Sequence, residues 1–90
     1  MGYKSVMNKE MGKYKIKDNI DLRSLEKYGY EDVVSVYRKY LEFGGVLFIN
    51  KNTRKITRVH PYDCRTNPTE WDISDIQEAG FVEEIRERSL

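Results

Sequence analysis

Three side chains that could do covalent chemistry, His60, Asp63 and Cys64, lie within five positions of this 90-residue sequence. A histidine can deprotonate a thiol and a carboxylate can orient the imidazole, so the set holds a nucleophile, a base and an orienting group. However, all three fall in one short loop after an expected strand, whereas catalytic partners normally come from separate elements that hold them rigidly. We therefore interpret His60 as the cap of a strand end and Cys64 as a small buried side chain, and expect no catalytic residues and no enzyme activity.

Metal and cofactor sites need ligand sets that this sequence does not supply. One cysteine and one histidine are fewer soft ligands than a structural zinc site takes. Asp72, Asp75 and Glu78 lack the spacing of a calcium loop and are interpreted as a solvated acidic face. Gly44-Gly45 lacks the Lys-Ser/Thr pair that follows the glycine in a phosphate-binding loop. We expect neither a metal nor a cofactor.

The charge of the chain is divided by position. Residues 1–69 hold 14 Lys/Arg and 8 Asp/Glu, whereas residues 70–90 hold 2 and 7, so the net charge of +1 combines a basic body of +6 with an acidic tail of −5. All seven tyrosines lie in the basic part. Aromatic rings interleaved with cations suit a surface that contacts another macromolecule. The sequence thus indicates binding, and two kinds of partner fit it.

We favour a non-enzymatic protein-binding module that inhibits or regulates another macromolecule. Charge polarity would orient the partner and speed association, and an acidic face can imitate nucleic acid toward a nucleic-acid-binding target. Small size and the lack of chemistry also suggest a phage or mobile-element accessory protein. Self-association into a homodimer is weighted equally with binding to a different protein, because the opposite charges on body and tail permit it. The expected contacts are tyrosines at breaks between elements and glutamates of the tail: Tyr28, Tyr30, Tyr62, Glu83, Glu84 and Glu87.

The alternative is nucleic-acid binding through a basic hairpin and its exit, residues 51–65. A two-stranded ribbon can enter a groove of a duplex, with cations on the phosphates and Tyr62 stacked on a base. Against this, the acidic tail could fold back and neutralise the hairpin, and the isoelectric point of 7.8 lies below the value of about 9 that marks nucleic-acid-binding domains. The residues of this alternative interface are Lys51, Arg54, Lys55, Arg58, His60 and Arg65.

The expected location is the cytoplasm. The longest apolar run, residues 46–49, covers four residues and is far shorter than the ~20 residues of a membrane span. The start of the sequence carries lysines throughout and lacks the apolar stretch of a secretory signal. A single cysteine agrees with a reducing compartment. No membrane partner is expected.

The elements that must position these residues indicate one α+β domain over residues 1–90. The composition, 39% apolar and 34% charged, is that of a globular chain. A main amphipathic helix, ended by Gly44-Gly45, is expected where apolar side chains recur at the spacing of one helical face. It would pack on an antiparallel sheet built around a β-hairpin of about residues 46–60, whose first strand should be central. The residues of the expected helical face are Val33, Val36, Tyr37, Tyr40 and Leu41.

Shorter elements are expected before the main helix. Residues 3–7 and 13–17 are interpreted as a hairpin, with a frayed helix as the alternative for the first half. The second half alternates cleanly between apolar residues and lysines. Asp21 can cap a short helix that Gly29 ends, because glycine tolerates the left-handed conformation.

The end of the chain is less regular. Trp71 and Ile73 are expected to extend the sheet. Residues 74–77 have the spacing of a capping box, which would start a short helix ended by Gly80. Residues 81–85 fit either a last strand or a last helical turn, and the periodicity leaves both open.

Overall fold

The computed structural model describes residues 13–42, 44–59 and 65–85. Within them, seven strands form one antiparallel sheet of order β2-β3-β4-β5-β1-β7, with β6 paired to β5. Two short helices accompany the sheet, the 3-10 helix η1 (Leu22–Tyr28) and the α-helix α2 (Ser74–Glu78). The strands are β1 (Tyr14–Ile16), β2 (Glu31–Val33), β3 (Val36–Tyr40), β4 (Val46–Asn50), β5 (Lys55–Val59), β6 (Arg65–Thr66) and β7 (Val82–Glu84).

The expected main helix is wrong, and with it the α+β class. The segment forms the hairpin β2–β3, in which Val33 pairs with Val36 across a two-residue turn. The residue types nevertheless suit a strand, because valine and tyrosine are favoured in strands and pack against cross-strand neighbours. Opposite charges also face each other across the hairpin, where Arg38 donates to Glu31 at 2.8 Å. Over the described ranges, the structure is therefore a small domain dominated by the sheet, with one short α-helix.

The predicted hairpin around residues 46–60 is confirmed. Strands β4 and β5 pair in the register that sets Ile49 opposite Ile56 and Leu47 opposite Arg58. The turn between them is held by Asn50, whose side-chain oxygen accepts from the backbone N–H of two turn residues. As expected, β4 is central, since it lies between β3 and β5.

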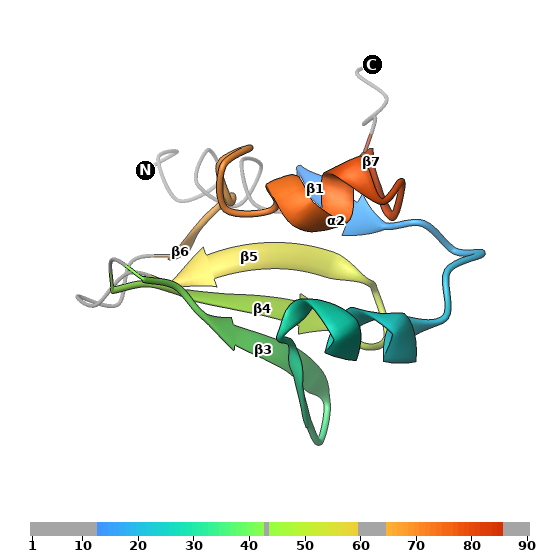
Figure 1. The fold of residues 1–90 in the computed structure, drawn as a ribbon, viewed down its shortest axis with the longest axis horizontal. Coiled ribbons are helices and arrows are strands. Elements are labelled where there is room, and N and C mark those ends of the chain that lie inside the picture. The colour runs from blue at the N-terminus through green and yellow to red at the C-terminus, as the bar shows by residue number, and fades with distance from the viewer. Residues whose placement is uncertain (1–12, 43, 60–64, 86–90) are drawn as a thin grey trace, which may run out of the picture.

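One face of the sheet carries the core. Buried side chains of β1, β3, β4 and β5 meet there, and the two helices lie side by side over them in Figure 1. The two helices contribute Leu25 of η1 and Ile76 of α2 to this core, and each side chain has 0% exposure. The buried apolar residues are Tyr14, Ile16, Leu25, Tyr30, Tyr37, Leu47, Ile49, Ile56, Ile73 and Ile76.

The first short elements follow the sequence closely. The carboxylate of Asp21 accepts from the backbone N–H of Arg23 at 3.0 Å, and Gly29 ends η1 with a φ of 90°, so both predicted signals are confirmed. The strand expected at 13–17 is also confirmed as β1, which pairs with β5 and β7. Its expected partner, residues 3–7, lies outside the described residues.

The last elements differ in part. The segment around Trp71 forms a turn and not a strand, and α2 begins after Ile73 with no side-chain cap, so the capping box does not form. Gly80 has a φ of 82° after α2, as expected of a helix terminator. The structure decides the open alternative at 81–85 in favour of strand β7. No helix in the described part of the chain is both long and apolar enough to cross a membrane.

Candidate functional site

Two adjoining hollows open beside the turn that precedes α2. The first has a volume of about 630 Å³ and lies between this turn and the ends of β3 and β5. The second, of about 670 Å³, lies along α2, and Trp71 and Ser74 line both. We call the pair the Trp71 groove. Its residues are Lys39, Tyr40, Leu41, Glu42, Arg58, Glu70, Trp71, Asp72, Ser74, Asp75, Gln77 and Glu78.

Two large aromatic side chains of the groove are exposed. Trp71, the only tryptophan of the chain, has 87% of its surface exposed, and Tyr40 has 64%. Folding gains little from an aromatic ring that remains in water, although tryptophan and tyrosine are the residues that most often dominate binding energy at protein interfaces. The aromatic pair is therefore what this groove offers to a partner.

A hydrogen-bonded turn fixes the position of Trp71. The backbone N–H of Thr69 donates to the carboxylate of Asp72 at 2.9 Å, and the backbone N–H of Asp72 donates back to the Thr69 hydroxyl at 3.2 Å. The next residue, Ile73, is fully buried in the core. The turn is thus pinned on both sides of the tryptophan, which projects from a held backbone.

Two ion pairs clamp the turn and α2 to the sheet. Lys39, Leu47 and Arg58 form one row across β3, β4 and β5 on the core face. Arg58 pairs with Asp72 at 3.3 Å and Lys39 pairs with Asp75 at 2.9 Å. The Arg58–Asp72 pair is largely buried, with 17% and 14% of the two side chains exposed. Both cations of the groove are therefore compensated within the protein.

The guanidinium of Arg58 is wedged against the backbone. A Cβ atom added at the buried Gly45 would lie 2.8 Å from the Nε of Arg58, so any other residue there would require the arginine side chain to shift. The Nε itself is buried and has no hydrogen-bond partner among the described residues. This packing holds Arg58 in place rather than presenting it to a ligand.

Beneath the groove, the ammonium of Lys39 lies 5.1 Å from the ring centre of Tyr30. Tyr30 is only 2% exposed, and its hydroxyl has no partner in the described part of the chain. Burial, with added effects from the carboxylates of Asp75 and Asp72, raises the pKa of this phenol far above its usual range. A neutral, buried phenol thus lies next to the ammonium of Lys39, which lines the first hollow.

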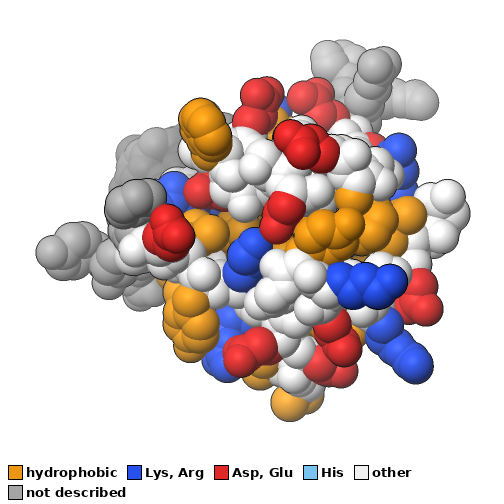
Figure 2. All heavy atoms as spheres, in the orientation of Figure 1, with side chains coloured by type: hydrophobic (Ala, Val, Ile, Leu, Met, Phe, Trp, Pro, Cys, Tyr) orange, Lys and Arg blue, Asp and Glu red, His pale blue; other side chains and the backbone are white. Residues whose placement is uncertain are grey.

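The carboxylates of the groove outnumber its cations. Within the described ranges, Glu42, Glu70 and Glu78 take part in no ion pair. Figure 2 shows acidic side chains gathered on this face of the molecule around the region that α2 occupies in Figure 1. The Trp71 groove therefore carries an excess of negative charge.

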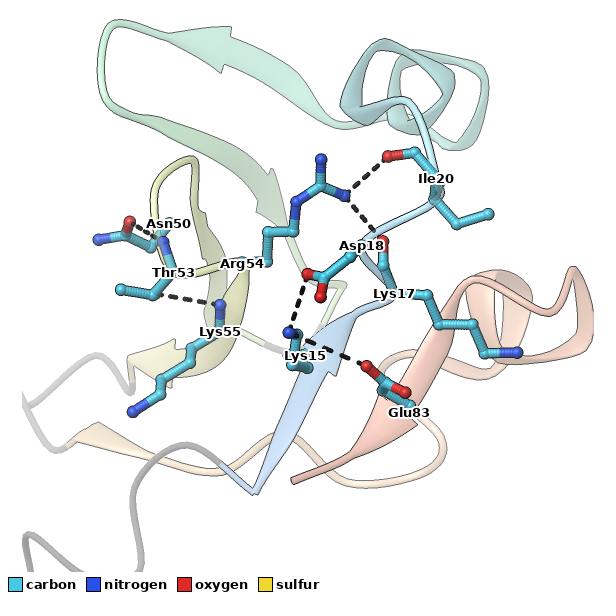
Figure 3. A network of polar contacts seen from close by, with 9 residues as sticks. All are labelled: Lys15, Lys17, Asp18, Ile20, Asn50, Thr53, Arg54, Lys55 and Glu83. Carbon is cyan, nitrogen blue, oxygen red and sulfur yellow. Dashed lines mark hydrogen bonds and ion pairs between the residues drawn. The ribbon is translucent and has the colours of Figure 1, made fainter. Parts of the chain in front are cut away.

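The residues of the nucleic-acid alternative are dispersed by the fold. Lys51 forms an ion pair with Asp32 and donates to the carbonyl of Val34 at 2.8 Å, so it fastens the β2–β3 turn. Arg54 donates to the carbonyls of Lys17 and Ile20 at 2.8 and 2.7 Å, as Figure 3 shows, and so ties down the connection after β1.

The other members of that set divide between two surfaces. Arg58 belongs to the clamp, on the core face. Lys55, on the opposite face of β5, and Arg65, in β6, are exposed. His60 lies outside the described residues, as do Asp63 and Cys64. The structure thus brings no more than two exposed cations of the set, Lys55 and Arg65, to the described surface, and the interface remains a prediction.

The residues expected to contact a protein partner are also dispersed. Tyr28 packs edge-on against Phe81 with ring centres 5.6 Å apart, and Tyr30 is buried in the core. Glu83 and Glu84 are exposed on β7, where Glu83 approaches Lys15 at 3.9 Å (Figure 3). Tyr62 and Glu87 lie outside the described residues. The glutamates of β7 thus remain available as predicted contacts.

Sequence reasoning missed the two exposed aromatic residues. Local periodicity places Tyr40 on a buried helical face and Trp71 in a strand, and neither position agrees with the structure. The signal that could have found Trp71 is its setting between two acidic residues, Glu70 and Asp72, in a stretch with few apolar neighbours. A tryptophan with charged residues on both sides has little apolar surface to pack against in its own segment.

In the described part of the chain, no three His, Cys, Asp or Glu side chains are grouped so that they could hold a metal ion. Comparisons with protein-family models, curated protein sequences and solved structures give no significant match.

Proposed function

We propose that this chain is a non-enzymatic protein-binding module of the cytoplasm, which inhibits or regulates another macromolecule by docking it on the Trp71 groove. One observation carries the proposal: the only tryptophan of the chain is 87% exposed on a fixed turn and lines two adjoining hollows. Tyr40, 64% exposed, lines the first hollow with it.

The energetics favour an aromatic anchor. Burying a tryptophan removes roughly 150–250 Å² from water, which corresponds to a gross gain on the order of 4–6 kcal/mol before the costs of association. Because the turn and the ion-pair clamp already hold the backbone at Trp71, little ordering of the backbone is required when a partner binds. An exposed aromatic side chain on a held backbone beside two hollows is the arrangement of an interface hot spot.

The test is affinity capture from nuclease-treated lysate of the source cell, at low and moderate salt. Wild-type protein should retain a specific partner, and Trp71→Ala should weaken its binding by at least about 30-fold, the loss expected for a hot-spot residue. Tyr40→Ala should give a smaller loss.

Val34→Ala is the matched control, since Val34 is 89% exposed on the β2–β3 turn and does not line the groove. It should leave capture unchanged. Equal capture by wild type and Trp71→Ala would refute the proposal, and capture that disappears after nuclease treatment would favour nucleic acid as the ligand.

A further inference from the structure

We infer that the Trp71 groove recognises a cationic segment of its partner, with an arginine or lysine side chain placed over the indole ring and between the neighbouring carboxylates. The inference rests on the proposed function and names the chemistry of the partner. It follows from the charges around the ring, from their existing pairings and from the exposure of the ring.

The charges of the groove are unequal. Five carboxylates and two cations line the two hollows. The two cations, Lys39 and Arg58, are already paired with Asp75 and Asp72. The remaining three carboxylates form no ion pair within the described residues, and they are Glu42, Glu70 and Glu78. A ligand of positive charge therefore complements the groove.

The indole ring of Trp71 also favours a positively charged ligand. Trp71 lines the second hollow together with Glu70 and Glu78. Among aromatic side chains, tryptophan gives the strongest attraction to a cation above its face, and a planar guanidinium can stack on the ring while it donates to carboxylates at the side. A cation that enters this hollow therefore meets a π face and two carboxylates.

The same features disfavour an anionic ligand. Phosphates would meet uncompensated carboxylates, and the cations that could attract them are already engaged in the clamp. The guanidinium of Arg58 lines the first hollow, but its charge is already compensated by Asp72, so it offers a phosphate little net attraction. We therefore expect a basic protein segment, and nucleic acid is an outcome that the experiment can report.

The experiment uses the fluorescence of Trp71, which reports on the groove because the chain has no other tryptophan. The purified 90-residue chain is titrated with a hexa-arginine amide, a hexalysine amide, a hexaglutamate peptide, a neutral Gly-Ser hexapeptide and single-stranded oligothymidylate. The basic peptides should give a saturable change that weakens as salt is raised, with hexa-arginine the stronger of the two. The other three probes should give none.

Matched variants distinguish binding at the groove from nonspecific attraction of the peptide to the acidic surface of the protein. The double variant Glu70→Gln/Glu78→Gln should weaken hexa-arginine binding at least fivefold. Glu83→Gln/Glu84→Gln removes the same charge from exposed positions of β7 outside the groove, and should weaken it less than twofold. Trp71→Ala, measured by calorimetry, should weaken it at least tenfold.

Several results would overturn the inference: no saturable change with either basic peptide, equal weakening by the two glutamine pairs, or a response to oligothymidylate. A fluorescence change on raising the concentration of the protein alone would assign the groove to a second copy of the chain instead. The capture experiment tests docking on the Trp71 groove separately from recognition of a cationic segment. If hexa-arginine fails while Trp71→Ala still loses the captured protein, docking on the groove stands and the cationic ligand is wrong.

Discussion

At the scale of single residues, Val34 is in an unfavourable conformation. It has a φ of 52° at the first position of the β2–β3 turn. A positive φ is uncommon for residues other than glycine and asparagine, and it is particularly unfavourable for a β-branched side chain, which crowds the backbone there. The side chain is 89% exposed, so packing does not offset this strain. The fold imposes the conformation through the pairing of its neighbours.

We expect Val34→Asn to stabilise the protein by about 0.5–1 kcal/mol, because the left-handed conformation costs most residues roughly 1–2 kcal/mol and asparagine adopts it more readily. Urea unfolding at neutral pH measures the difference. The matched control is Val36→Asn in β3, where the strand conformation suits valine, and it should destabilise the protein. A loss of stability at both positions would show that Val34 is not strained.

The buried phenol of Tyr30 makes stability depend on alkaline pH. Burial raises the pKa of Tyr30, and burial also raises that of Tyr37. Above a pH of about 10 the unfolded chain releases these protons while the folded protein keeps them, so the stabilising contribution is complete below that pH and decreases as pH rises toward the folded pKa values.

Tyr30→Phe should therefore reduce the loss of unfolding free energy at alkaline pH, and the loss that remains is due to Tyr37. At neutral pH it should be neutral or stabilising by up to about 1 kcal/mol, because the removed hydroxyl is buried without a partner in the described part of the chain. Urea midpoints between pH 8 and pH 11 measure both effects, with Leu41→Met as a control that removes no titrating group. An unchanged pH profile would contradict this assignment.

At the scale of elements, the ion pair of Arg58 and Asp72 joins β5 to the turn that carries Trp71. Removing one member of a buried pair leaves a desolvated charge and costs more than removing both. We expect Asp72→Ala to cost about 2–3 kcal/mol, and Asp72→Ala combined with Arg58→Met to cost at least about 1 kcal/mol less than the sum of the single changes.

The control for this cycle is the more exposed pair of Arg38 and Glu31, with 32% and 60% of the side chains exposed. Its coupling should be smaller than that of Arg58 and Asp72, because water screens exposed charges. Urea unfolding of the single and double variants measures both couplings. Additive losses at Arg58 and Asp72 would mean that the pair does not hold the turn on the sheet.

At the scale of the whole molecule, folding brings some acidic residues of the C-terminal segment against cations of the basic part, so the opposite charges partly neutralise each other. Two acidic side chains of the segment after residue 69 pair with cations of β3 and β5. Lys51 and Arg54 fasten turns elsewhere. The basic hairpin therefore offers much less free charge than its sequence indicates, which leaves Lys55 and Arg65 as the exposed cations of the alternative interface in the described residues.

We expect wild-type protein and Lys55→Ala/Arg65→Ala to bind duplex and single-stranded nucleic acid equally weakly at physiological salt. If these cations do bind phosphates, the double variant should instead reduce the salt slope on duplex DNA by about 0.9 for each phosphate that is no longer neutralised. Fluorescence anisotropy over a range of salt concentrations distinguishes the two outcomes. Arg54 is unsuitable for this test, because replacing it also removes its hydrogen bonds to two backbone carbonyls.

The sequence by itself determined the elements whose signals are local. The β4–β5 hairpin, strand β1 and the caps of η1 are predictable because turn residues, clean alternation, an Asp cap and a terminating glycine act within a few positions. The lack of an apolar run long enough to span a membrane can likewise be read directly from the order of the residues.

Only the tertiary structure decided the rest. Residues 33–41 combine the apolar spacing of a helix with residue types that are favoured in strands. The strand is stabilised by pairing with β4, by the cross-strand contact of Arg38 with Glu31 and by the hydrogen bond of Lys51 to Val34. The Trp71 groove likewise depends on contacts between segments far apart in the sequence, such as Arg58 with Asp72 and Lys39 with Asp75. Periodicity reports which side chains share a face, but whether that face is buried depends on what the rest of the chain places against it.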